Sequence, residues 1–198
     1  MKKKIFKSLA VVACALLLVV GSVVGTFAYM TSKTGVVTNT FTAGNVAITL
    51  DEAKVTVYGE LDGDSRVNAN TYKLIPGHTY KKDPTIKVAT GSEDCYLFVK
   101  IENGLGASET TIATQLANNG WTALNGQDGV YYYSANSSKV SAEATVKVFE
   151  SFTLAGTADV AALASKTITV QAYAIQADGF ANAPAAYEAA PCTWGANN

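Results

Sequence analysis

The chain has 198 residues, of which 48% are hydrophobic and 16% are charged, and its formal net charge is −1. This length is enough to bury the core of one domain. The balanced charge argues against a basic surface for nucleic acid or for anionic lipid.

The N-terminal segment has the layout of a secretory signal peptide. Four lysines precede the uncharged apolar stretch Leu9–Val24, and small residues then stand at the two positions that signal peptidase reads. We therefore expect residues 1–28 to be removed by cleavage between Ala28 and Tyr29. An uncleaved membrane anchor is the alternative, although glycine and serine interrupt the apolar run. Cleavage removes four lysines and no acid, so the net charge falls from −1 to −5. The protein would then be secreted and meet the membrane only through its signal.

Of the three cysteines, Cys14 leaves with the signal, whereas Cys95 and Cys192 remain. A disulfide between them is possible in an exported protein, and two free thiols are the alternative. Sequence alone does not say whether their Cα atoms come within bonding range.

Alternating apolar residues predict a mainly β domain over residues 45–198. The pattern is clear at 46–50, at 95–102 and at 167–175. Shorter strands are expected at 85–89, 130–133 and 145–154, the last with a bulge near Phe149.

Glycine, proline and asparagine mark the connections between these strands. Pro76-Gly77 predicts a type II turn, and the polar segment 62–71 is interpreted as a loop. Short helices are expected after Ser108, after Thr157 and at 183–190. The whole pattern predicts an antiparallel β-sandwich with two or three short helices in its connections.

Catalytic motifs are absent from this pattern. The single histidine, His78, cannot build the paired histidines of a zinc protease, and no GxSxG elbow accompanies it, so we interpret it as a turn residue. Asp62, Asp64, Asn68 and Asn70 offer oxygen ligands that suit calcium, but the EF-hand pattern is incomplete and a solvated loop is favoured. We predict no catalytic residue, no metal site and no cofactor.

Several stretches together resemble the TasA/camelysin family of secreted bacterial proteins. They are GTFAY at the end of the signal, TFTAGNVAITLDE, LIPGHTYKKDPTI, CYLFVKIEN, GWTALNGQDGVYYY and ITVQAYAIQADGF. The resemblance covers residues 25–180 and implies a jelly-roll-like sandwich. It also implies a structural subunit of extracellular biofilm-matrix fibres, whose signal is cut by a SipW-type peptidase. The implied partners are further copies of the same chain, with an accessory matrix protein as a further candidate.

In the assembly of this family, the N-terminal segment freed by cleavage becomes a strand of the next subunit. Carried onto this chain, the donor segment is 29–44, and the donor strand is Val36, Val37, Thr38, Asn39, Thr40, Phe41 and Thr42. Threonine and valine favour extended backbone, which suits that role. The groove that would accept the strand cannot be assigned from the sequence, and an ordinary first strand in its own domain is the alternative.

Two other functions stay open at this point. Camelysin-like members imply a secreted metalloprotease, although this chain lacks a metal-protease pattern. A surface adhesin or sugar-binding module is the other, with Tyr131 and Tyr133 stacking on the sugar. Packing of these tyrosines in the core is the simpler interpretation.

Overall fold

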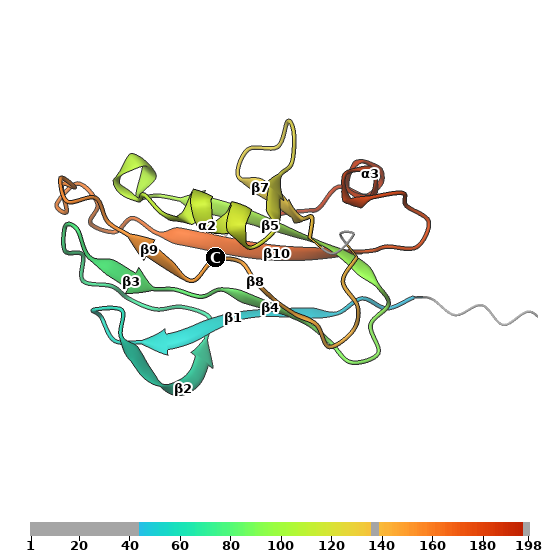
Figure 1. The fold of residues 1–198 in the computed structure, drawn as a ribbon, viewed down its shortest axis with the longest axis horizontal. Helices are drawn as coiled ribbons and strands as arrows, with labels where there is room; N and C mark the ends of the chain where they lie inside the picture. The colour runs from blue at the N-terminus through green and yellow to red at the C-terminus, as the bar shows by residue number, and fades with distance from the viewer. Residues whose placement is uncertain (1–43, 136–138, 196–198) are drawn as a thin grey trace, which may run out of the picture. The chain divides into compact units, whose positions relative to one another are not determined.

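The computed structural model describes residues 44–135 and 139–195, in which ten strands form three antiparallel sheets (Figure 1). The first sheet has the order β2 (Leu61–Val67), β1 (Ile48–Val55), β4 (Thr85–Val88), β8 (Thr145–Lys147). The second has the order β10 (Ile168–Gln176), β5 (Cys95–Asn103), β7 (Val130–Tyr133), β6 (Trp121–Ala123). The third pairs β3 (Thr79–Lys81) with β9 (Ser151–Thr153). The helices are η1 (Gly106–Ser108), α2 (Ile112–Asn118) and α3 (Ala183–Ala189).

Strand β5 divides the apolar interior into two clusters. Leu97 and Val99 face the cluster between the two larger sheets, where Ile86 of β4 also packs. Phe98 faces a second cluster, which contains Tyr187 of α3. The predicted alternation of this strand is therefore confirmed, as is the antiparallel sandwich with short helices. Helix α3 adds a layer outside the second sheet.

The single strand expected at 145–154, with a bulge near Phe149, is instead two strands, β8 and β9, which belong to different sheets. The side chain of Gln115 holds the interruption: its Oε1 accepts a hydrogen bond of 2.8 Å from the Glu150 amide, and its Nε2 donates one of 2.9 Å to the Ser151 carbonyl. A helix side chain therefore satisfies the backbone where the strand leaves its ladder.

The interpretation of 62–71 as a loop is wrong, because β2 occupies its first half. Glu52 of β1 pairs with Val67, and Val55 pairs with Leu61. Nearly every side chain of β2 is exposed, so no apolar alternation marks the strand. This segment is a strand because its backbone pairs with β1 in a hairpin, and burial of its side chains plays little part.

The helix expected after Thr157 is also wrong, since residues 160–165 form turns. There, Asp159 Oδ1 accepts a 3.0 Å bond from the Ala161 amide, and its short side chain closes a turn. The other two helices are present. In α2 the capping side chain is that of Glu109, whose Oε1 accepts from the Ile112 amide at 3.0 Å, instead of the predicted Ser108. In α3 Asn182 Oδ1 accepts from the Ala185 amide at 2.9 Å.

Candidate functional site

Strand β10 presents an open backbone edge. The Gly104 amide donates to the Thr167 carbonyl at 2.8 Å, and the Ala177 amide donates to the Asp94 carbonyl at 2.7 Å. Odd-numbered residues of β10 therefore bond to β5, and the amides and carbonyls of the even-numbered residues point the other way. These are Ile168, Val170, Ala172, Ala174 and Gln176. Within 44–135 and 139–195, no strand pairs with this edge.

Strand β1 has a second open edge along its first half. The Ala89 amide donates to the Ala47 carbonyl at 2.9 Å, which makes this a hydrogen-bonded pair. By the same alternation, the backbone groups of Ile48 and Leu50 point away from β4. Strand β2 covers β1 only from Glu52 onward, so no strand of the described part of the chain pairs with Ile48 or Leu50 on that side.

One part of each edge borders a cavity of about 880 Å³, at Leu50 of β1 and at Ile168 and Val170 of β10. Leu50 of β1 and Val67 of β2 line one side, and Leu163, Ile168 and Val170 line the other. Ile48, Leu50, Ile168, Val170, Ala172 and Ala174 all pack partly buried against the core between the sheets. Among the described strands, both sheets thus end at unpaired edges above an apolar floor, and we call this feature the edge groove.

Strands β1 and β10, which border the edge groove, run in opposite directions (Figure 1). The two ends of the groove are different. At one end Gly44 lies against Gln176, where a Cβ on Gly44 would come 2.5 Å from Gln176 Oε1. At the other end, Leu50 and Ile168 both line the cavity. The chain itself therefore enters the domain at the Gln176 end, and the cavity lies at the Ile168 end.

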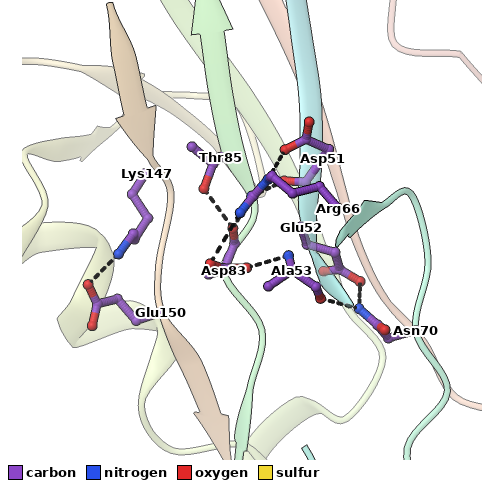
Figure 2. Close-up of polar contacts among 9 residues, drawn as sticks. All are labelled: Asp51, Glu52, Ala53, Arg66, Asn70, Asp83, Thr85, Lys147 and Glu150. Atoms are coloured by element: carbon purple, nitrogen blue, oxygen red, sulfur yellow. Dashed lines mark hydrogen bonds and ion pairs between the residues drawn. The ribbon is translucent and has the colours of Figure 1, made fainter. Parts of the chain in front are cut away.

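A cluster of charged side chains lies beside the cavity (Figure 2). Glu52 is 4% exposed, and its Oε1 accepts a 2.9 Å bond from Asn70 Nδ2. Its Oε2 lies 2.6 Å from Lys82 Nζ. Asp83 is 7% exposed and accepts from the Ala53 amide at 2.7 Å. The buried carboxylates are thus paired or hydrogen-bonded, as buried charge requires.

Arg66 and Tyr72 complete this cluster. The Arg66 guanidinium bonds to the Asp51 carboxylate and lies 3.5 Å from Asp83 Oδ2, which ties β2 to β1 and to the start of β4. Burial, then the charges of Glu52 and Asp83, raise the pKa of Tyr72. Its hydroxyl therefore stays protonated and donates to the Lys81 carbonyl at 3.0 Å. The cluster is a structural support for the β1–β2 hairpin beside the groove.

Most of the sequence-predicted site residues lie outside the described residues. These are the cleavage residues Ala28 and Tyr29 and the donor strand Val36–Thr42. The described chain begins at Gly44, two residues after the end of the donor strand at Thr42.

The possible disulfide is not formed: Cys95 and Cys192 are both free and buried. Cys95 belongs to the cluster between the sheets, and Cys192 belongs to the cluster beneath α3. Strand β5 separates these clusters, so the two sulfur atoms lie on opposite faces of one sheet. Burial, and to a lesser degree the charge of Asp94, raises the pKa of Cys95 to about 11, and burial raises that of Cys192 to about 12.

These buried thiols predict a loss of stability at alkaline pH. A thiol whose pKa is raised by folding contributes its full stability below the ordinary value of 9.0 and loses it as pH rises towards the folded value. From pH 9 to 11 we expect Cys95 to lower the free energy of unfolding by about 3 kcal/mol. Urea unfolding of the wild type and of the Cys95→Ala, Cys192→Ala double variant between pH 7 and 11 would measure it. If the free energy of unfolding of the double variant falls between pH 9 and 11 as much as that of the wild type, the thiols do not cause the loss of stability.

Among the other candidate ligands, His78 and Asp62 already have partners in the fold. His78 Nε2 lies 2.9 Å from the Tyr58 carbonyl oxygen, and Asp62 lies 2.7 Å from Lys54 Nζ. Among the described residues, no group of three or more His, Cys, Asp or Glu side chains is placed to hold a metal ion. In the same residues, no helix is long and apolar enough to span a membrane.

Tyr131 and Tyr133 are half-buried and pack against the core between the sheets. Tyr133 also contacts Trp121 edge-on, with ring centroids 5.4 Å apart. This packing supports the simpler interpretation of these rings over sugar binding.

Sequence reasoning missed the edge groove and the charged cluster. Two adjacent acids such as Asp51-Glu52 are typical of a solvated surface, yet Glu52 is buried against Lys82. The available signal was the position of Glu52 on the apolar side of a strand that also carries Leu50. Comparison with protein-family models, with curated proteins and with solved structures finds no match to the chain.

Proposed function

We propose that this protein is a secreted structural subunit of extracellular biofilm-matrix fibres, which polymerises when the N-terminal segment of one copy enters the edge groove of the next. The observation that carries the proposal is a pair of strand edges, β10 and the first half of β1, that no strand of residues 44–135 or 139–195 covers, beside one apolar cavity. Unpaired edges of this kind accept an additional strand, whose backbone gives affinity and whose alternate side chains fill the groove.

The length and the pattern of the donor strand suit this edge. Val36–Thr42 has seven residues, and the open stretch Ile168–Ala174 of β10 has seven as well. An incoming strand satisfies the outward amides and carbonyls of β10, while Val37 and Phe41 share one of its faces.

The charges of the donor segment and of the domain are opposite in sign. Residues 29–44 contain one lysine and no acid. Five of the 15 basic residues precede residue 45 and all 16 acidic ones follow it, so residues 45–198 carry 10 − 16 = −6. The positive charge of the segment favours its association with the acidic domain of another copy.

Donor and acceptor are different surfaces, so the contact propagates as an open filament instead of closing as a dimer. Removal of the signal by a SipW-type peptidase would free the donor segment and set the start of polymerisation. The jelly-roll-like connectivity belongs to the same proposal.

Electron microscopy of three purified chains tests the proposal. We expect the chain that begins at Tyr29 to form fibres, and the chain that lacks residues 29–44 to stay monomeric. A chain with extra residues before Tyr29 should polymerise poorly, because the groove would have to accommodate these residues in addition to the donor strand. A folded, monomeric Tyr29 chain at high concentration would contradict the function.

A further inference from the structure

The exposed apolar residues of the domain are gathered at one end. Among the residues that the structure describes, the large hydrophobic side chains that are exposed are Val57, Tyr58, Leu61, Ile75 and Val160. We call this set the apolar end. Figure 1 places the β1–β2 hairpin, the start of β3 and the segment between β9 and β10 at the same end of the sandwich. The Lys73 amide donates to the Val57 carbonyl at 2.8 Å, which fixes the hairpin to the segment that leads to Ile75.

The apolar end adjoins the edge groove. Val160 belongs to the apolar end and also lines the cavity, together with Leu163 and Ile168. This is the end of the groove that the chain's own entry at Gly44 leaves open, because Gly44 lies at the opposite end, beside Gln176. A strand from another copy therefore has its free entrance at the apolar end.

The entrance fixes the direction of an incoming strand. Its N-terminus lies deep in the groove and its C-terminus lies at the apolar end, where its own domain begins. It then runs from the Gln176 end towards the Ile168 end, antiparallel to β10 and parallel to β1. Successive copies keep one orientation along the fibre.

The connection between donor strand and domain is short. Only Ala43 and Gly44 separate Thr42 from Asn45, whose carbonyl accepts a 3.0 Å bond from the Glu93 amide and so belongs to the folded domain. Two extended residues span roughly 7 Å. A copy whose strand occupies the groove must therefore bring its own body against the entrance.

We infer that the apolar end is a head-to-tail contact surface for a second copy of this chain, which meets it with the end around Asn45 and Glu93. This inference rests on the proposed donor-strand function. The contact removes from water the side chains that the isolated domain leaves exposed, Leu61 above all, at 57% exposure. It contributes to fibre affinity separately from the strand in the groove.

The test compares the critical concentration for fibre formation, by sedimentation, for chains that begin at Tyr29. We expect Leu61→Asp to raise it about ten-fold or more, because a carboxylate is then desolvated in the contact. Ala123→Asp is the matched control, since it adds the same charge to exposed residue 123 of β6, at the far edge of the second sheet, and should leave the value unchanged. Circular dichroism should show both variants folded, because both positions are exposed.

A synthetic peptide of residues 29–44 separates the two proposals. In excess it should block fibre growth of the wild type by filling the edge groove. If the peptide blocks growth but Leu61→Asp polymerises like the wild type, the end contact is wrong and the strand exchange stands. If the peptide leaves growth unaffected, strand exchange fails and the end contact that depends on it fails as well.

Discussion

Replacing Ala172 with proline is expected to prevent fibre formation while leaving the domain folded. The Ala172 amide points away from β5, so a proline ring there removes no hydrogen bond from the β10–β5 ladder. It does remove a donor from the outer edge and adds bulk where another strand would lie. The lost bond, together with the carbonyl left unpaired on the incoming strand, amounts to about 2–3 kcal/mol. That corresponds to a roughly 30–150-fold higher critical concentration.

Two matched variants show whether the edge itself matters. Ala172→Val keeps the amide and favours extended backbone, so it should polymerise like the wild type. Tyr173→Pro removes an amide that bonds to Phe98 of β5 and should unfold or weaken the domain. Sedimentation and thermal unfolding of the three variants are the measurements. Normal fibres from the Ala172→Pro chain would exclude the outer edge of β10 as the strand acceptor.

Replacing Lys82 with methionine is expected to destabilise the domain by about 3–5 kcal/mol. The change leaves the carboxylate of Glu52, whose side chain is 5% exposed, with Asn70 as its remaining side-chain partner. A buried charge without its counter-ion is costly because water no longer solvates it. Adding Glu52→Gln removes the charge and keeps an acceptor for Asn70, so the double variant should recover most of the loss. Urea unfolding at pH 7 measures all three free energies.

An exposed ion pair provides the control for this cycle. Lys147 Nζ lies 2.7 Å from Glu150 Oε1, and the two side chains are 41% and 63% exposed (Figure 2). Lys147→Met should cost less than about 1 kcal/mol, because solvent screens the pair. Equal losses from Lys82→Met and Lys147→Met would mean that burial does not set the strength of the Glu52 contact.

The parts of the fold that the sequence predicted are those where burial decides the residue type. In β5, Leu97 and Phe98 are buried on the two opposite faces that a period of two assigns to them. The side chains of β2 are nearly all exposed, so their composition resembles that of a loop, and only the pairing of Glu52 with Val67 reveals the strand. Local pattern carries no information about such pairing.

The edge groove could not be predicted for a related reason. No residue type marks an unpaired edge, since Ile168 and Val170 would look the same in a central strand. The groove arises from which strands lie next to β10 and β1, and this depends on the whole topology. The donor segment, in contrast, follows from a resemblance, its threonine and valine content suits an extended strand, and it remains a prediction.

Helix α3 constrains the kind of polymer that such a subunit can make. Its residues Ala186 and Tyr187 pack on the outer face of the sheet that carries β10. The helix therefore covers part of this outer face, and the partner sheet covers the inner face. In amyloid, flat sheets with exposed faces pack directly on one another. Here the helix occupies part of the outer face, so a sheet of another copy cannot pack flat against it. We therefore expect thin filaments of folded beads, sensitive to denaturant and without the cross-β diffraction signature.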